Sequence, residues 1–298
     1  MMYDRAIALL RTGDEAKSAA ALREFLEKFK SHSLAPDAME TLATIQHRAG
    51  RYDESARLCS AFLASYPGHA LAESVQFLAA ENLYLKGDLE SASAAYEGFI
   101  TDHANSTIAA TASFRLGVAL FQLKQYDRAR PLLETSARSS DATFRPAILC
   151  LGDLLFQRGE WAGAAAQFER YVAFGKDAPS SDDAVLKLGL CLQHQEKPAE
   201  ALTRFEQLLT DYDQSPHRTQ AMFERGRSLL ALGKSEEAAA AFKRVVSEDG
   251  ESPFGPLARS DLGAIALRSG DYAAASTQFE QAAGAATTEE AKAEAVFQ

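Results

Sequence analysis

Eight short segments of this chain resemble one another and recur at a nearly constant spacing. They are TGDEAKSA, AGRYDESA, KGDLESAS, LKQYDRAR, RGEWAGAA, QEKPAEAL, LGKSEEAA and SGDYAAAS. Each holds a glycine or a substitute at one fixed position: Gly13, Gly50, Gly87, Lys124, Gly159, Glu196, Gly233 and Gly270. These positions are 37 residues apart at every step except the fourth, which is 35. The regularity predicts one array of repeats and not the two globular domains that 298 residues would otherwise suggest.

Small and larger side chains recur at fixed distances in the sequence from each of these eight residues. Seven residues before lie Ala6, Ala43, Ala80, Gly117, Gly152, Gly189, Gly226 and Gly263, and five residues after lie Ser18, Ser55, Ala92, Ala129, Ala164, Ala201, Ala238 and Ala275. Four residues further along lie Leu22, Cys59, Tyr96, Leu133, Phe168, Phe205, Phe242 and Phe279. We expect two antiparallel helices in each repeat, close together where the small residues meet, with the larger residue filling space toward the next repeat. The residue at the turn would end the first helix in a left-handed conformation.

Composition favours helices along the whole chain. Alanine is abundant and β-branched residues rarely run together, which favours helix over strand. Only 9 prolines and 18 glycines are present, so long disordered linkers are not expected. The fold class is therefore predicted to be all-α.

The repeat resembles the tetratricopeptide repeat. The family's order of small, turn, aromatic, small and aromatic positions is matched by Gly152, Gly159, Trp161, Ala164 and Phe168. The same frame recurs as Gly263, Gly270, Tyr272, Ala275 and Phe279, and in part as Gly117, Tyr126 and Ala129. The resemblance covers residues 3–286 and implies a right-handed α-solenoid of helix-turn-helix repeats.

The resemblance divides the chain into a single solenoid of eight repeats. Their expected ranges are 3–33, 34–70, 71–107, 108–142, 143–179, 180–216, 217–253 and 254–288, followed by a truncated first helix of a ninth repeat at 289–298. Because EEAKAEAVFQ ends the chain within a helical pattern, we expect a fragment of a longer protein.

The period of 37 residues is longer than the family's usual length of about 34. The extra residues lie between repeats, as in FLEKFKSHSLAPDAMETL and FLASYPGHALAESVQFL. This longer form resembles repeats of bacterial envelope proteins, such as the Tol-Pal coordinator and the lipoprotein of outer-membrane assembly.

Motifs that would indicate catalysis or metal binding are incomplete. Gly233-Lys234-Ser235 resembles the end of a phosphate-binding loop, but Ser228 stands where that loop needs glycine. The acidic run that begins at Asp211 has Pro216 in place of the central glycine of a calcium loop. The six histidines form no metal-binding pattern, although His47 and His194 are placed to face the partner groove described below. We expect no enzymatic activity, no cofactor and no metal site.

Charge and hydropathy exclude further classes of partner. The formal net charge is −10, and no cluster of Lys and Arg offsets it, so nucleic acid is not an expected partner. No stretch approaches about 18 consecutive apolar residues, so no membrane insertion is expected. The first residues, MMYDRAIALLRTGDE, do not form a secretion signal. The chain would be periplasmic if cut from a secreted parent, and otherwise cytoplasmic.

The three cysteines, Cys59, Cys150 and Cys191, are far apart and odd in number. They predict no disulfide framework, and we expect them to be small buried residues.

The resemblance implies that the first helices line a concave groove, with inward positions ten, six and three residues before each turn. The candidate partner-binding residues at or beside these positions are Phe77, Glu81, Tyr84, Phe114, Phe121, Gln122, Leu149, Asp153, Phe156, Gln157, Phe223 and Arg227. Aromatic members of this set would anchor a protein or peptide, and polar members would form hydrogen bonds with it. The alternative is that some of the aromatic side chains pack between neighbouring first helices.

The chain is therefore predicted to be a non-enzymatic scaffold that binds a peptide or helix of a partner protein in this groove. A bacterial envelope or multiprotein assembly is the expected setting. Two alternatives stay open: a structural module that forms homo-oligomers through the ends of the solenoid, and a regulatory arm of an enzyme whose catalytic domain lies outside this fragment.

Overall fold

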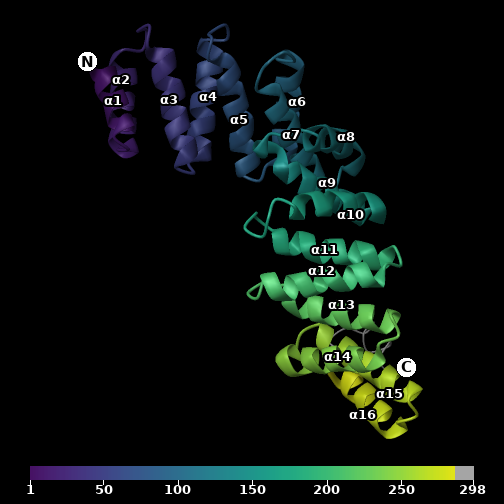
Figure 1. The fold of residues 1–298 in the computed structure, drawn as a ribbon. Coiled ribbons are helices and arrows are strands. Elements are labelled where there is room, and N and C mark those ends of the chain that lie inside the picture. The colour runs from purple at the N-terminus through teal and green to yellow at the C-terminus, as the bar shows by residue number, and fades with distance from the viewer. Residues whose placement is uncertain (286–298) are drawn as a thin grey trace. The chain divides into compact units, whose positions relative to one another are not determined.

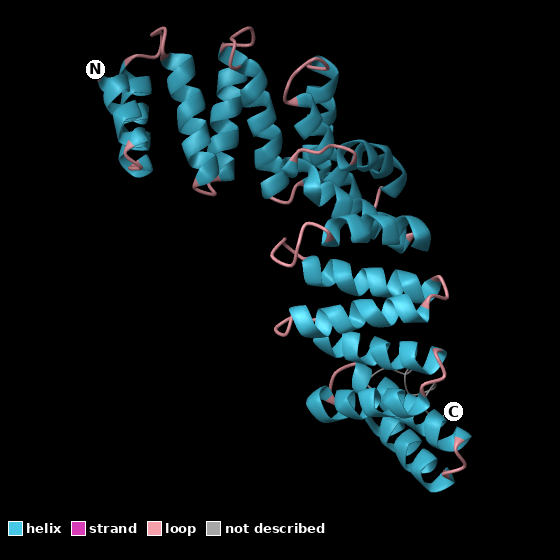
Figure 2. Ribbon diagram, in the orientation of Figure 1, coloured by secondary structure: helices cyan, strands magenta, loops and turns pink. Residues whose placement is uncertain are grey.

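The computed structural model describes residues 1–285, and these residues are all-α, as predicted (Figure 2). The helices are α1 (Met2–Arg11), α2 (Glu15–Lys28), α3 (Ala35–Arg48), α4 (Tyr52–Ser65), α5 (Ala72–Leu85), α6 (Leu89–Asp102), α7 (Ala109–Gln122), α8 (Tyr126–Ala137), α9 (Arg145–Gln157), α10 (Trp161–Val172), α11 (Ser181–His194), α12 (Pro198–Asp211), α13 (Arg218–Ala231), α14 (Ser235–Asp249), α15 (Phe254–Arg268) and α16 (Tyr272–Ala285). A 3₁₀ turn, Ala142–Phe144, precedes α9. No helix in this part of the chain is long and apolar enough to cross a membrane. The truncated ninth helix predicted at 289–298 lies outside the described residues.

The chain divides into two compact units, Met1–Cys150 and Leu151–Gln298, and α9 contains the boundary. Within each unit, consecutive helices pack against one another in antiparallel pairs (Figure 1). We call the odd-numbered helices first helices and the even-numbered ones second helices. The shorter step of 35 residues, from Lys124 to Gly159, contains this boundary. Within the same step, α8 has 12 residues, whereas α2 has 14.

Every one of the eight turn residues has the predicted left-handed backbone. Their φ angles run from 58° at Glu196 to 85° at Gly13. In the first turn, the N–H of Gly13 donates to the carbonyl of Leu10 and that of Asp14 donates to the carbonyl of Leu9, at 3.0 Å each. These two bonds form a Schellman motif, which satisfies carbonyl groups at the helix end. The turn is therefore set by its own hydrogen bonds even where lysine or glutamate replaces glycine.

The close approach of the two helices in each pair is confirmed. Ser18 Oγ donates to the carbonyl of Ala6 at 2.8 Å, and Ser55 Oγ donates to that of Ala43 at 2.8 Å. Both serines are fully buried. Small side chains at these positions let one helix approach the backbone of the other.

The larger residue fills space within its own helix pair as well as toward the next repeat, and the prediction gave only the second contact. A Cβ added at Gly189 would lie 2.5 Å from Cε1 of Phe205, and one at Gly226 would lie 2.5 Å from Cε1 of Phe242. The ring therefore covers the small residue of its own helix pair and is not directed only toward the next repeat. In four of the later repeats a phenylalanine lies against a glycine, whereas the first repeat combines Ala6 with Leu22. The match of size is not general, because Ala80 is combined with Tyr96 and Gly117 with Leu133.

The extra residues of the long repeat form a hydrogen-bonded loop between helix pairs. His32 Nδ1 accepts from the N–H of Leu34 at 3.1 Å, and His69 Nδ1 accepts from the N–H of Leu71 at 3.2 Å. Ser215 Oγ occupies the equivalent position and accepts from the N–H of His217 at 3.1 Å. It also donates to Asp182 Oδ2 near the start of α11 at 2.6 Å. This bond joins the loop that follows α12 to the first helix of the same repeat.

The cysteines behave mainly as core residues. Cys59 and Cys191 are fully buried, whereas Cys150 is half-buried, and all three are free thiols. Burial raises the pKa of the Cys59 thiol to about 11 and that of Cys191 to about 12. Both buried thiols are thus protonated at neutral pH.

Gly226→Ala should destabilise the fold by about 1–3 kcal/mol, because its Cβ must displace the buried ring of Phe242. Chemical denaturation of the full chain, followed by circular dichroism, measures this change. The control is Gly98→Ala in α6, where nothing lies within 4 Å of the added atom, and which should stabilise by up to about 1 kcal/mol. A loss of equal size for both variants would contradict the packing argument. Adding Phe242→Leu to Gly226→Ala should recover part of the loss.

Lys124→Gly should stabilise the chain by about 1 kcal/mol, because glycine adopts the φ of 59° without strain. The same measurement applies. Lys243→Gly, at an exposed position inside α14, is the matched control and should cost about 1 kcal/mol. If both substitutions destabilise the chain, the left-handed strain assigned to Lys124 is incorrect.

Candidate functional site

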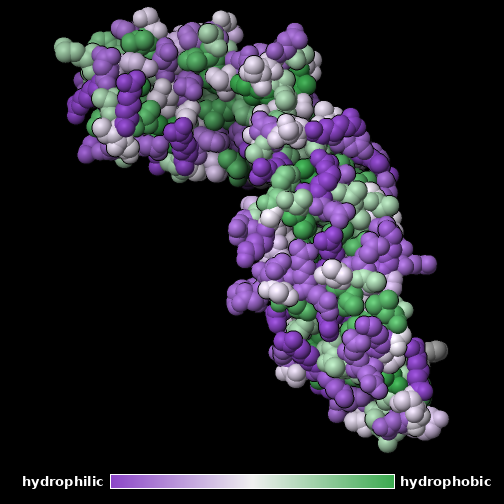
Figure 3. All heavy atoms as spheres, in the orientation of Figure 1, coloured by the Kyte–Doolittle hydropathy of each residue, from purple (hydrophilic) through white to green (hydrophobic). Residues whose placement is uncertain are grey.

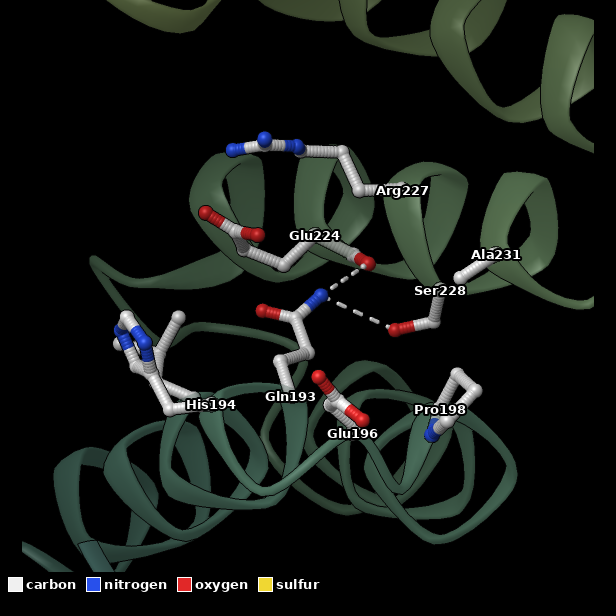
Figure 4. Close-up of a pocket in the computed structure, with 9 residues that line it drawn as sticks. Gln193, His194, Glu196, Pro198, Glu224, Arg227, Ser228 and Ala231 are labelled. Atoms are coloured by element: carbon white, nitrogen blue, oxygen red, sulfur yellow. Dashed lines mark hydrogen bonds between the residues drawn. The ribbon is translucent and has the colours of Figure 1, made fainter.

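A pocket of about 560 Å³ lies between two neighbouring first helices of the second unit, α11 and α13. Its lining residues are Leu190, Gln193, His194, Glu196, Pro198, Glu224, Arg227, Ser228 and Ala231 (Figure 4). Its size falls within the range of about 300–1,000 Å³ that is usual for ligand sites. The pocket combines apolar walls with both signs of charge.

The floor of the pocket is fixed by one amide that bridges the two helices. Gln193 Nε2 donates to the main-chain carbonyl of Glu224 at 3.1 Å and to Ser228 Oγ at 3.0 Å, as the dashed lines in Figure 4 show. Ser228 is buried, so the amide satisfies a hydroxyl that water does not reach. The bridge holds α11 and α13 in register.

A similar polar bridge occurs between first helices of the first unit. His47 Nδ1 lies 2.8 Å from Asn82 Oδ1, and Asn82 Nδ2 donates to Ser55 Oγ at 2.9 Å. His47 and Gln193 both lie three residues before their turns, and their partners both lie five residues before the next turn. Polar side chains at this pair of positions therefore connect neighbouring repeats.

Glu224 places a carboxylate at the pocket although the residue is only 8% exposed. Burial raises the pKa of this carboxyl group, with a smaller raising effect from Asp261, while Arg227 and Gln193 lower it. Figure 4 shows the carboxylate of Glu224, the guanidinium of Arg227 and the imidazole of His194 on the same side of the pocket. The Arg227 guanidinium lies 5.8 Å from the centre of the Phe223 ring, in a cation–π arrangement.

An aromatic stack supports the pocket where the chain turns after α11. The rings of Trp161 and His194 are parallel within 7°, and their centroids are 4.0 Å apart. Phe156 packs edge-on against Trp161 at 5.2 Å, and Gln195 Nε2 donates to the carbonyl of Trp161 at 3.2 Å. Trp161 is the chain's only tryptophan, so its fluorescence reports on the environment of His194.

Two acidic residues predicted to contact a partner form ion pairs with the next first helix. Arg115 Nε lies 3.1 Å from Glu81 Oε1, and the same Glu81 oxygen accepts a hydrogen bond from the buried Tyr96 hydroxyl. Lys187 Nζ lies 2.6 Å from Asp153 Oδ1 and 2.7 Å from Asp183 Oδ2. Burial raises the pKa of Asp153 even though Lys187 lowers it. Both predicted residues therefore contribute to contacts between repeats.

The aromatic members of the predicted set are less available than a binding stripe requires. Phe114 and Phe223 are each 4% exposed and belong to the core, because they pack against Phe144 and against Phe242 and Phe254. The contact of Phe223 with Phe254 lies between neighbouring first helices, as the alternative expected, whereas Phe144 lies in the 3₁₀ turn and Phe242 on the second helix α14.

The other rings are half-buried. Phe77 packs against Tyr96 and Phe99, Phe121 against Tyr126, and Phe156 against Trp161 and Phe168.

The remaining predicted residues lie at several places along the first helices. Tyr84 accepts a hydrogen bond at its hydroxyl from Gln122 Nε2 at 3.3 Å, and the Arg115 guanidinium lies 5.7 Å from its ring centre. Leu149 is half-buried and Gln157 is exposed. Of the whole predicted set, Arg227 alone lines the pocket between α11 and α13.

The sequence prediction left out most residues of this pocket. His194, which the sequence places at the groove, lines the pocket but is outside the predicted set of site residues. Gln193 occupies one of the inward positions and is also outside that set, and Glu224 and Ser228 lie outside the inward positions. Within residues 1–285, no group of three or more His, Cys, Asp or Glu side chains is arranged to hold a metal ion.

Lys187→Met should destabilise the chain by about 1–3 kcal/mol at pH 7, because two partly buried carboxylates lose a shared cation. Its pH dependence has a definite sign. Without Lys187 the folded-state pKa of Asp153 rises further above its unfolded value of about 3.9, so the folded state binds more protons. The deficit relative to the wild type should therefore grow as pH rises from about 4 to 7 and vanish in more acidic solution.

Denaturation curves of both proteins across this pH range test the prediction. The control, Lys234→Met, removes an exposed ion pair with Glu237 and should change stability by less than about 0.5 kcal/mol. A deficit for Lys187→Met that does not depend on pH would contradict the electrostatic explanation.

Known families and structures match this chain along most of its length. The model described as tetratricopeptide repeat-like domain matches residues 54–191, and those described as tetratricopeptide repeat match 3–70, 186–256 and 256–281. None of the curated proteins matches the chain.

Solved structures show the same fold at low sequence identity. A tetratricopeptide repeat protein from Parabacteroides merdae is 18% identical, with a TM-score of 0.54, and the match covers 89% of this chain and 97% of that one. YrrB, described as a tetratricopeptide repeat protein with an unusual peptide-binding site, is 18% identical with a TM-score of 0.52, and 69% of this chain and 100% of YrrB are covered. The apo quorum sensor NprR from B. thuringiensis is 12% identical with a TM-score of 0.52, over 95% and 86% of the two chains.

The turns, the close helix pairs and these matches lead to one conclusion. The chain belongs to the tetratricopeptide repeat family.

Proposed function

We propose that the chain is a non-catalytic scaffold that binds a segment of a partner protein along its first helices. The observation that carries this proposal is the pocket between α11 and α13, which is bordered by polar groups from both helices. A peptide-binding site is part of the description of YrrB, which shares the fold. On the face that Figure 3 shows, hydrophobic side chains are interspersed with hydrophilic ones, and such a surface suits a peptide of mixed character.

The half-buried rings Phe77, Phe121 and Phe156 are secondary anchors in this proposal. Each is held by aromatic neighbours, so its exposed edge is preorganised and a partner would lose little entropy in contacting it. Phe114 and Phe223 are excluded as anchors because their rings are buried. A bacterial envelope setting and association through the ends of the array stay predictions.

Ala231→Phe should weaken binding of peptides selected from a random twelve-residue library by at least about tenfold, or about 1.4 kcal/mol. Ala231 is exposed and lines the pocket, so a phenyl ring there fills the pocket without entering the core. Fluorescence polarisation of labelled peptides with the full chain measures affinity.

The matched control is Ala240→Phe, which adds the same ring at an exposed position of α14 outside this pocket. Affinity should be unchanged in this control. Selected peptides that bind wild type and Ala231→Phe equally would refute the pocket as the binding site. A library that yields no binder at all would refute the scaffold function.

A further inference from the structure

Two contacts between neighbouring first helices pair opposite charges at equivalent positions, and the pocket differs from both. The residue six before one turn meets the residue nine before the next turn, as in Glu81 with Arg115 and Asp153 with Lys187. At the pocket the same two positions hold Leu190 and Glu224. An acid therefore stands where the other two pairs have a cation, and a leucine stands where they have an acid.

Among the residues that the structure describes, the carboxylate of Glu224 forms no direct ion pair, although the charge of Arg227 on the same helix lowers its pKa against the rise that burial causes. The residue is only 8% exposed. By contrast, Glu81 and Asp153 each have a cationic nitrogen within 3.1 Å. A buried carboxylate that forms no direct ion pair is costly, and it creates a favourable site for a cation from outside the chain.

Charges around the pocket favour a positive ligand. Glu224 and Glu196 oppose the single positive side chain of the lining, Arg227. Figure 4 shows Glu196 projecting from the turn after α11 toward the pocket, with the Glu224 carboxylate on the wall formed by α13. Asp261 adds further negative potential at Glu224. The formal net charge of −10 would also steer basic partners to the chain.

Apolar residues complete a shape suited to a long aliphatic side chain. Leu190, Pro198 and Ala231 lie on the pocket lining beside these charged groups. Lysine and arginine combine a methylene stem that packs on apolar surface with a charged end group. A shorter or neutral side chain would leave the carboxylate unpaired.

We propose that this pocket takes a lysine or arginine side chain of a bound peptide, whose cationic group pairs with Glu224. The methylene stem lies on Leu190 and Pro198, and Glu196 supplies a second negative charge at the entrance. This inference rests on the proposed peptide-binding function and specifies the class of residue that the pocket recognises.

Five short peptides test the specificity. The parent is acetyl-Ala-Ala-Lys-Ala-Ala-amide, and its central lysine is replaced by arginine, norleucine, glutamine or glutamate in the other four. Binding to the full chain is followed by the fluorescence of Trp161, which stacks on the pocket residue His194. The lysine and arginine peptides should bind at least about tenfold more tightly than the norleucine peptide. Equal affinity of the lysine and norleucine peptides would overturn the proposal.

Glu224→Gln tests the residue, because it keeps the side-chain shape and removes the charge. It should weaken binding of the lysine peptide by at least about tenfold and leave the norleucine peptide unaffected. Glu236→Gln, on the exposed surface of α14, changes net charge equally and should affect neither peptide. An equal loss for both peptides in Glu224→Gln would show a structural role and refute charge recognition.

Thermal denaturation separates a binding role from a structural one. If Glu224 is a binding residue with an uncompensated charge, Glu224→Gln should leave the melting temperature unchanged or raise it. A lowered melting temperature, together with unchanged peptide discrimination, would contradict the proposal.

Butylamine, which carries the same cation without a peptide, distinguishes the source of the ligand. The lysine peptide should bind more tightly than butylamine, and equal binding would assign the pocket to free amines.

Failure of this inference is distinguishable from failure of the scaffold function. One outcome is that library-selected peptides bind Ala231→Phe more weakly than wild type, and yet bind Glu224→Gln with unchanged affinity and tolerate replacement of their lysine and arginine residues. This result would support the scaffold function and refute the cation pocket. Peptides that bind wild type and Ala231→Phe with equal affinity would refute the proposed function itself.

Discussion

The contact between a small residue on each first helix and a larger side chain on the second determines how the rest of the chain is arranged. At Gly226 the ring of Phe242 lies so close to the backbone that a methyl side chain at position 226 would have to displace the ring. The two helices can therefore approach this closely because glycine has no side chain. Because this contact uses one face of the first helix, other faces remain for contacts with neighbouring repeats. Those faces carry the polar bridges and ion pairs described above, and the pocket is built on them.

Burying polar groups between first helices costs desolvation free energy, and this cost explains how their contacts are arranged. Glu81 and Asp153 are withdrawn from water, and each is stabilised by a cation one repeat further along. Gln193 likewise stabilises the buried hydroxyl of Ser228 by donating a hydrogen bond to it. The charges of Glu81 and Asp153 are therefore already compensated within the chain, so a partner would gain little from these two groups.

Sequence reasoning predicted the helix pairs and their turns because these depend on residues close together in the chain. It recovered Lys124 and Glu196 as left-handed residues from their register alone. It did not recover the burial of Phe114, because the ring is covered by Phe144 from a 3₁₀ turn in the one irregular step. Gln193 and Glu224 were missed for a related reason. Their roles depend on residues 31–35 positions away, and the signal was the comparison of equivalent positions in successive repeats.

The contrast between paired and unpaired acids also bears on how such a scaffold acquires specificity. A repeat array needs a close helix contact in every unit, so the first helix keeps glycine or alanine at this position in all eight repeats. Side chains nine residues before each turn are freer, since they include Arg115, Lys187 and Glu224 in three different repeats. At the proposed cation pocket, Glu224 replaces the cation that Arg115 and Lys187 supply at the equivalent position. In this proposal a bound partner supplies the cation, so selectivity for a basic residue would arise from the same electrostatics as these two ion pairs.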